Sequence, residues 1–525
     1  LTLVLDTHAA VERHSRSFDA DAHHALARRA AGESVVLLKN DDALLPLAEG
    51  TRVAVIGDFA ETPRYQGAGS SAVNSIKVDT FLDCLNDSGL YSVGFAPGFD
   101  RQGKPDAAKQ AEAVALAAKA DAVLLCLGLD EIKESEGLDR ADMKLADNQI
   151  ELLQAVREAN PNTVVIVNAG ASLETPWLAH CKALVYGALG GQAGAGAMVD
   201  VLTGKINPGG KLAETWANAY ADTPARDHFA GPGRTVQYRE GLYVGYRYYQ
   251  TAGVPVAFPF GHGLSYTQFA YSDLHADAHS ATLTVTNTGD RAGAEIVQLY
   301  VAKPNAEIFR PAQELKAFAK VQLAAGESKT VTLMLDDKAF RYWNTRTDSW
   351  EVEGGTYELR VGASSADIRL TAAVEVIGTD ALNPYAGKAL PHYQSGKVQT
   401  VPDAEWETLL SRPIPDDRVK IDRNMTLGEL NHGRSPLGWL VWAVLTALLN
   451  ASYKKGKPDL NVLFQYNMPL RALAKMTNGA ISMGMVDGIV MEVQGFWVIG
   501  LVRVIFEAVK NVILNAQLEN RLRNS

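Results

Sequence analysis

Cysteine is nearly absent from this chain of 525 residues, which contains only Cys84, Cys126 and Cys181. Three cysteines placed so far apart exclude a disulfide framework and a cysteine-based zinc site. Cys126 stands inside an apolar run, where a free thiol behaves as a small hydrophobic residue. This usage favours a reducing compartment such as the cytoplasm, without settling the localisation.

Positive charge is also in deficit, because the formal net charge at pH 7 is -10. Phosphate binding requires a basic face, so this balance excludes nucleic acid as the main partner. The rest of the composition, 47% apolar and 21% charged, is that of an ordinary soluble globular protein. The length allows about two to four domains.

A leader segment is another feature that the sequence lacks. The chain begins at Leu1 and shows no positively charged segment followed by an apolar stretch. Residues 1–19 resemble the end of a segment that is already under way. We therefore expect the natural polypeptide to begin upstream of Leu1.

The C-terminal region holds the longest apolar runs, but neither is a clear membrane span. Residues 435–449 are apolar and shorter than a bilayer requires. Residues 489–514 are long enough, yet Glu492, Arg503 and Glu507 interrupt them. We expect a packed helical extension, with a homodimer contact or a membrane-surface contact as the alternatives.

Buried strands alternate with helices over the first part of the chain. Strands are predicted at 52–58, 121–128, 162–170 and 183–191, and helices at 107–119, 146–159 and 193–203. Strands that are apolar on both faces and alternate with helices predict an α/β fold with a mostly parallel sheet. Such sheets place ligand groups in loops beyond the carboxyl ends of the strands.

The pattern of apolar and polar residues changes at about residue 263. From there, short segments alternate apolar and polar residues between Gly, Asp and Asn turns, which predicts an antiparallel β-sandwich of the immunoglobulin-like kind. Residues 380–420 are weakly patterned and predict a linker that lies over a surface.

Six carboxylates crowd into residues 130–145, directly after the apolar strand at 121–128. They are Asp130, Glu131, Glu134, Glu136, Asp139 and Asp142. A solvated acidic loop is the ordinary explanation of such a cluster. Its place beyond the carboxyl end of a predicted parallel strand favours a functional loop instead.

Six segments carry a resemblance to one family. In chain order they are SVVLLKNDDALLPL, RVAVIGDFAETPRYQGAGSS, ESEGLDRADMKL, GKLAETW, EGLYVGYRYYQ and FPFGHGLSYTQFAYSDL. Together they resemble the C-terminal half of glycoside hydrolase family 3, the β-glucosidase and β-xylosidase group. The following strands resemble the family's fibronectin type III-like domain, and the helical end is similar to an extension of some bacterial members.

The resemblance implies a multidomain protein of the α/β plus all-β class. It also implies that the family's N-terminal (β/α)8 barrel, which supplies the nucleophilic aspartate, is missing from this chain. The divisions expected are a barrel tail and connecting segment at 1–30, an α/β sandwich domain at 31–225, an interdomain connection at 226–262, a fibronectin type III-like domain at 263–378, a linker at 379–420 and a helical extension at 421–525.

The family's chemistry implies a role for the acidic loop. Retaining glycosidases use two carboxyl groups about 5–5.5 Å apart, one as nucleophile and one as acid/base. The family's E-G-x-D-R pattern matches Glu136, Gly137, Asp139 and Arg140, which implies Glu136 as the acid/base, with Glu134 as runner-up. Burial and a nearby carboxylate, which the acidic loop gains when it docks against a second domain that holds another Asp, are expected to raise its pKa. Asp139 and Arg140 are expected to support the loop as an ion pair.

The implied activity is hydrolysis of terminal β-D-glucosyl or related residues, with a β-glucoside or oligosaccharide substrate and no metal or organic cofactor. Ser70 and Ser71 could donate hydrogen bonds to sugar hydroxyls, or form a turn packed against the missing barrel. A non-catalytic carbohydrate-binding or interaction module is the alternative function.

Two further motifs point less clearly to function. Residues 190–200 are rich in glycine, but their spacing does not fit a dinucleotide-binding loop, so close packing is expected. His23 and His24 are neighbours, which point in different directions on a helix and make a poor metal site.

Overall fold

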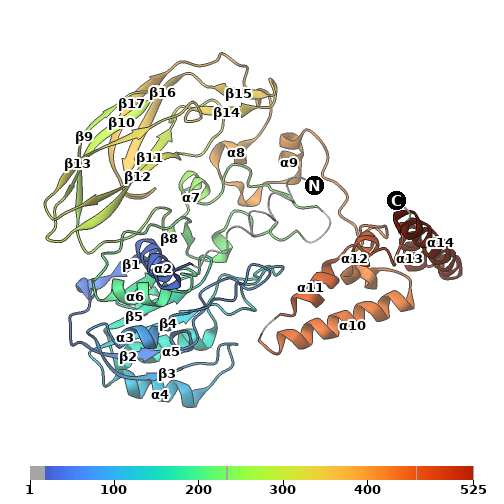
Figure 1. Cartoon of the computed structure of the whole chain (residues 1–525). Helices are drawn as coiled ribbons and strands as arrows, with labels where there is room; N and C mark the ends of the chain where they lie inside the picture. The colour runs from blue at the N-terminus through green and yellow to red at the C-terminus, as the bar shows by residue number, and fades with distance from the viewer. Residues whose placement is uncertain (1–17, 232–234, 457, 524–525) are drawn as a thin grey trace.

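The computed structural model describes residues 18–231, 235–456 and 458–523. It shows an α/β domain, a β-sandwich next to it and a group of C-terminal helices to one side (Figure 1). Most of the predicted barrel tail at 1–30 lies outside the described residues. Its described part leads into helix α2, Ala20–Ser34, which Asp19 caps by accepting a hydrogen bond from the backbone N–H of Ala22.

A six-stranded sheet forms the centre of the α/β domain. Its order is β1-β6-β5-β4-β2-β3, with bounds Val36–Asn40, Ala183–Tyr186, Thr163–Asn168, Ala122–Gly128, Arg52–Ile56 and Tyr91–Ala96. All pairs are parallel except β1 with β6, so the predicted mostly parallel sheet is confirmed. Strand β3 was not predicted, because its sequence YSVGFA mixes polar and small residues.

Helices flank this sheet and complete its hydrophobic core. They are α3 (Phe81–Leu85), α4 (Ala107–Ala117), α5 (Asp147–Ala159) and α6 (Gly194–Leu202). Every residue of β4 is buried, as a central strand covered on both faces requires. Gly57, which follows β2, has φ +112, and a Cβ there would lie 2.1 Å from the carbonyl oxygen of Cys126. Only glycine fits this close approach of two strands.

The β-sandwich consists of antiparallel strands in two main sheets. One has the order β13-β10-β9, with bounds Ser328–Met334, Ser280–Asn287 and Phe269–Ala276. The other has the order β12-β11-β16-β17, with bounds Glu314–Leu323, Gly293–Ala302, Gly355–Gly362 and Ile368–Val376. A hairpin of β14 and β15 adds Arg341–Asn344 and Ser349–Val352. The alternation in β10 buries Ala281, Leu283 and Val285, which confirms the predicted sandwich.

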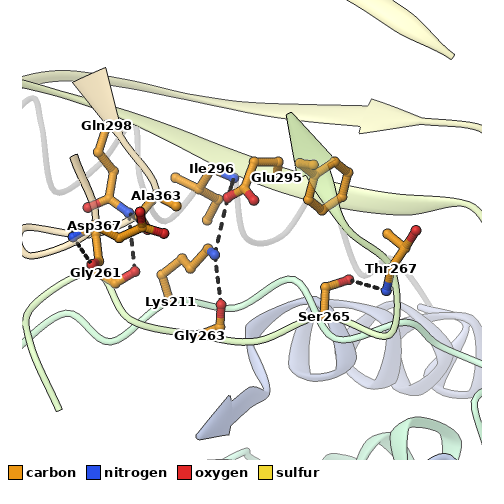
Figure 2. A network of polar contacts seen from close by, with 12 residues as sticks. Lys211, Gly261, Gly263, Ser265, Thr267, Glu295, Ile296, Gln298, Ala363 and Asp367 are labelled. Carbon is orange, nitrogen blue, oxygen red and sulfur yellow. Dashed lines mark hydrogen bonds and ion pairs between the residues drawn. The ribbon is translucent and has the colours of Figure 1, made fainter. Parts of the chain in front are cut away.

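Polar contacts join the α/β domain to the sandwich (Figure 2). The Nζ of Lys211 donates to the carbonyl oxygen of Gly263 at 2.8 Å and lies 3.1 Å from Oε1 of Glu295 on β11. Both side chains of this ion pair are almost fully buried. The Nε2 of Gln298 donates to the carbonyl oxygens of Gly261 and Ala363. These contacts fix the two domains against each other.

His262 belongs to the same seam, where its ring is enclosed by Phe258 and the backbone of Leu38. Its Nε2 donates to the carbonyl oxygen of Leu38 at 3.0 Å, and its ring stacks on Phe258. Burial lowers the pKa of His262 below its usual 6.5, and the charge of Lys211 adds to this, while the Leu38 hydrogen bond and Asp367 oppose it. The unfolded chain therefore takes up this proton at a higher pH than the folded chain.

We expect this histidine's stabilising contribution to be complete above its unfolded pKa and to be lost as the pH falls from about 6.5 through the folded pKa. Urea unfolding of the wild type and of His262→Gln, compared across this window, measures the contribution. Gln keeps a donor for Leu38 but cannot titrate, so the wild type should lose more stability on acidification than the variant. Parallel curves for the two proteins would contradict the assignment.

The segment after the sandwich packs against the seam through aromatic side chains. It contains α8 (Pro391–Ser395) and α9 (Asp403–Leu410). It covers α7 (Tyr246–Ala252) and the short strands β7 (Trp216–Ala217) and β8 (Val256–Phe258). Tyr393 of α8 is buried and accepts, through its backbone carbonyl, a hydrogen bond from the hydroxyl of Tyr243. The predicted domain boundaries themselves stay predictions.

The C-terminal extension is helical, as expected. Its helices are α10 (Pro436–Tyr453), α11 (Leu460–Asn467), α12 (Leu473–Met476), α13 (Met483–Val493) and α14 (Trp497–Arg523). The run at 489–514, treated as one segment above, is divided between α13 and α14 by a turn at Gly495, whose φ is +103. By length and composition α10 could cross a membrane, with a hydropathy of 1.3 and 22% of its span buried.

Candidate functional site

The acidic loop leaves the carboxyl end of β4, where the sheet places its functional loops. Asp130 is buried, and its Oδ1 accepts hydrogen bonds from the backbone N–H groups of Ile132 and Lys133 at 3.1 and 2.7 Å. Burial raises the pKa of Asp130, and the two N–H donors oppose this rise. Asp130 therefore shapes the start of the loop.

Glu134 is held inside the loop by Arg64, which follows β2. The Arg64 side chain is 1% exposed and that of Glu134 is 18% exposed. The guanidinium donates to Oε2 and to the backbone carbonyl of Glu134, and also to the carbonyl of Leu129 at 3.1 Å. The backbone N–H of Gly170, beyond β5, donates to the same Oε2 at 2.9 Å. Glu134 thus ties three loops of the sheet edge together.

Glu136 lies two residues further on and is exposed. Its Oε2 accepts a hydrogen bond from the backbone N–H of Ser70, and its own backbone N–H donates to the carbonyl of Ala68 at 2.9 Å. A parallel bridge between Ala68 and Ser135 joins the two loops. The carboxylate is therefore fixed in direction while it faces solvent.

The charge state of Glu136 in this chain differs from the expectation for an acid/base. Hydrogen bonding by Ser70, through its side chain and its backbone N–H, lowers the pKa of Glu136, and burial does not offset this effect. The predicted rise required burial and a neighbouring carboxylate. Neither surrounds Glu136 within the described residues, so the pKa of Glu136 is lowered in the chain by itself, and the rise expected on docking with a second domain stays a prediction.

Gly69 makes this contact possible. Its φ is +134, and a Cβ there would lie 2.5 Å from Cβ and 2.6 Å from Oε2 of Glu136. We expect Gly69→Ala to displace the carboxylate, break the Ser70 contact and let the pKa of Glu136 rise toward its ordinary value. A ¹³C NMR titration of the carboxyl group, assigned with Glu136→Gln, measures the shift.

Gly67→Ala is the matched control for this variant. Gly67 lies in the same loop, and a Cβ there would meet only Oγ of Ser71 at 3.5 Å, an ordinary contact distance. Its titration should follow the wild type. A wild-type titration for Gly69→Ala as well would show that the Ser70 contact does not set the carboxylate's pKa.

Arg140 does not pair with Asp139, contrary to the expectation. Asp139 is exposed, whereas the Arg140 side chain turns inward and its Nη1 donates to the carbonyl oxygen of Ser172 at 3.2 Å. Its Nε and Nη2 are buried without a hydrogen-bond partner among the described residues. Burial lowers the pKa of Arg140, and nearby carboxylates, Glu134 and Asp142 first among them, oppose this. Arg140 therefore holds the loop through its hydrogen bond to the backbone of Ser172 and through its attraction to the charges of Glu134 and Asp142.

Sequence reasoning missed Glu214, which lies in the GKLAETW segment. Desolvation of its carboxyl group raises its pKa, although the residue keeps contact with solvent. Hydrogen bonding by Ser172 and the charge of Arg140 oppose the rise. The only available signal was a carboxylate inside a short family motif. The charges of Glu214 and Glu134 both interact with that of Arg140, so these three residues form one charged cluster beside the acidic loop.

The other predicted residues lie as follows. Ser70 and Ser71 are both exposed at this edge, and Ser70 uses its backbone N–H for Glu136. The glycine-rich stretch serves packing, because a Cβ on Gly196 would lie 2.8 Å from the guanidinium of Arg28 on α2. His24 is buried between Asp79 and Gln192, with Nε2 and Nδ1 each 3.0 Å from its partner atom.

The helical extension reaches the acidic loop. Gly137 follows Glu136 directly, has φ +77, and would carry its Cβ 3.0 Å from a methyl group of Leu463 on α11. Leu463 is buried. On the same side, a Cβ on Gly456, between α10 and α11, would lie 2.8 Å from Nε2 of Gln102. The helical extension therefore packs, through Leu463, against the loop that carries Glu136.

Comparison with known families agrees with this arrangement. Residues 35–266 match the glycosyl hydrolase family 3 C-terminal domain, and residues 295–365 match the fibronectin type III-like domain. An α/β domain followed by such a sandwich is the arrangement that these two family models describe. The chain belongs to glycoside hydrolase family 3, of which it carries the C-terminal portion.

Three relatives illustrate the likeness. The chain is 44% identical over 400 residues to an exo-alpha-(1->6)-L-arabinopyranosidase of Bifidobacterium breve, which is 73% of this chain and 53% of that protein. It is 43% identical over 385 residues to thermostable beta-glucosidase B of Acetivibrio thermocellus, 70% of this chain and 50% of that protein. The crystal structure of a Bifidobacterium adolescentis GH3 beta-glucosidase superposes with a TM-score of 0.70 at 43% identity, over 76% of this chain and 60% of that one.

The chain thus spans about half the length of the curated relatives that it matches. Within residues 18–231, 235–456 and 458–523 the structure shows no (β/α)8 barrel.

Proposed function

We propose that the full-length protein containing this chain hydrolyses terminal, non-reducing β-D-glucosyl or related β-glycosyl residues with retention of configuration. In this proposal the chain supplies Glu136 as acid/base and does not supply the nucleophile. The observation that supports the role most directly is the fixed, outward-facing carboxylate of Glu136, at the carboxyl edge of a parallel sheet.

The proposed reaction uses Glu136 twice. As an acid it gives its proton to the glycosidic oxygen while the nucleophile attacks the anomeric carbon, and as a base it then takes a proton from the water that hydrolyses the glycosyl-enzyme intermediate. In the chain by itself, Ser70 favours the ionised form of Glu136. Docking of a second domain with its own carboxylate would bury Glu136 and raise its pKa, so the acid form arises only in the assembled site.

The supporting residues keep this carboxylate in place. Arg64 and Glu134 fix the loop from within, and Gly69 leaves room for Glu136. Ser70 and Ser71 stay proposed as donors to sugar hydroxyls. The glycone is proposed as glucose, or as a pyranose that presents the same equatorial anomeric bond, as an α-L-arabinopyranoside does.

Hydrolysis of a panel of aryl glycosides by the full-length protein tests the proposal. The expected result is turnover of β-glucosides or α-L-arabinopyranosides, with the retained anomer appearing first by ¹H NMR. First appearance of the inverted anomer would contradict the mechanism. Binding of these sugars without any turnover would instead favour the alternative, a non-catalytic carbohydrate-binding module.

The C-terminal helices form the second part of the proposal. Their exposed apolar faces serve as a contact surface of the protein, for a second copy of the chain or for a membrane surface. Large apolar patches on a water-soluble protein mark such contacts.

A further inference from the structure

Helix α14 leaves its outer face uncovered. Its inner face packs on α13 so closely that Gly488 and Gly500 meet, with a Cβ on Gly500 only 2.7 Å from the carbonyl oxygen of Gly488. Further along, Arg503 pairs with Asp487 at 2.8 Å, and Asn511 donates to the carbonyl of Gly479. Arg503 and Asn511 are therefore engaged within this hairpin.

The opposite face of α14 is apolar and exposed. Its side chains keep between 53% and 76% of their surface in water; they are Val498, Ile499, Leu501, Val502, Ile505, Phe506, Val509, Val512 and Ile513. At roughly 100 Å² for each side chain, this face offers on the order of 900 Å², more than the about 800 Å² that each partner buries in a stable complex.

The spacing on this face is that of a helix-pairing seam. Val498, Val502, Ile505, Val509 and Val512 follow one another at intervals of four, three, four and three residues. This is the heptad repeat of a coiled coil, with β-branched residues at both core positions. Ile499, Phe506 and Ile513 widen the seam on one side, as a bundle of more than two helices requires. We name the five core residues the α14 seam.

The geometry points to a second copy of this chain as the partner: two α13–α14 hairpins pack through their α14 seams, related by a two-fold axis, into a four-helix bundle. This inference rests on the proposal that the C-terminal helices are a contact surface, and names the helix and the partner. A symmetric dimer needs one self-complementary patch, and a straight apolar seam with its charges turned away fulfils that condition.

A membrane surface fits this helix less well. Helices that lie on membranes present a polar face rich in Lys and Arg to the headgroups. In α14 the cations beside the apolar face are already paired, Arg503 with Asp487 of α13 and Lys510 with Glu507 of α14 itself. A heptad repeat also has no use in a lipid phase, because lipid contact needs only an apolar arc.

The test uses the full-length protein in sedimentation equilibrium at micromolar concentration. The wild type should be a dimer, and the double variant Ile505→Asp, Val509→Asp should dissociate with a Kd at least ~100-fold weaker, since two charges enter the seam of each copy. Both residues face solvent, so the hairpin should keep its helix content by circular dichroism.

The matched control is Leu440→Asp, Val444→Asp on the exposed face of α10, which should remain dimeric. If the α10 double variant dissociates and the α14 double variant does not, the inference about α14 is overturned. The wider proposal, that the C-terminal helices are a contact surface, would still stand in that case. A monomeric wild type that sediments with neutral phosphatidylcholine vesicles would overturn it in favour of a membrane. A monomeric wild type that ignores vesicles would refute both parts.

A second measurement does not depend on destabilising charges. Oxidation of Val509→Cys should link two copies through the seam, whereas Ile377→Cys, which is 94% exposed on the sandwich, should not link them. Absence of the seam disulfide in a protein that is still dimeric would place the dimer contact elsewhere.

Discussion

Glu136→Ala in the full-length protein should lower kcat on β-glucosides with poor leaving groups, such as cellobiose, by about 10²- to 10⁴-fold. The reason is that an alkoxide of high pKa cannot leave without a proton. A dinitrophenyl glucoside needs no proton to depart, so its first step should stay near the wild-type rate, and the intermediate should accumulate because water has lost its base. Stopped-flow measurement of the leaving-group dependence tests both effects.

Asp139→Asn is the matched control, because Asp139 is an exposed carboxylate of the same loop with no ion pair to Arg140. Its leaving-group dependence should equal that of the wild type. An unchanged rate of Glu136→Ala on cellobiose would remove Glu136 from the mechanism. A steep dependence for Glu134→Gln instead would transfer the role to the runner-up.

Arg64→Met should destabilise the chain by about 3–5 kcal/mol, the usual result of removing one partner from a buried ion pair. Without Arg64, the N–H of Gly170 is the one hydrogen-bond donor left to the carboxylate of Glu134 among the described contacts. The carbonyl oxygen of Leu129 also loses the hydrogen bond from the guanidinium. Urea unfolding of the chain measures the loss.

Arg52→Ala serves as the control for this variant. Arg52 also lies at β2, and it pairs with Asp121, but the two side chains are 54% and 48% exposed. An exposed pair contributes about 0–1 kcal/mol, so the loss should be small. Equal losses for the two variants would mean that burial does not decide the value of the Arg64 contact.

The sheet and the sandwich could be predicted because their signals are local and repeated. The apolar run of β4 and the two-residue alternation of β10 each specify burial without knowledge of a partner. β3 escaped prediction because a mixed edge strand carries no such pattern. The break between α13 and α14 depends on the backbone angle of one glycine inside an apolar run, and such a run looks continuous until that angle is known.

The candidate site could be predicted in position but not in its contacts. The carboxyl end of β4 and the family motif locate Glu136, yet only the fold brings Ser70 to its carboxylate and Arg64 to Glu134. Arg140 and Asp139 are neighbours in sequence, so an ion pair was the simplest expectation. In the structure Arg140 is turned inward and bonds to the carbonyl oxygen of Ser172 instead. Ser172 is far from Arg140 in the sequence, so this contact could not be predicted from it.

The central claim is that Glu136 is the acid/base of a retaining site, and rescue of Glu136→Ala by azide tests it most directly. Azide is a strong nucleophile that needs no general base and fits the space of the missing carboxylate. With a dinitrophenyl β-glucoside, azide should restore turnover of the full-length variant, and the product should be the β-glucosyl azide, formed by attack on the covalent intermediate. No acceleration by azide, or an α-glucosyl azide, would contradict the account.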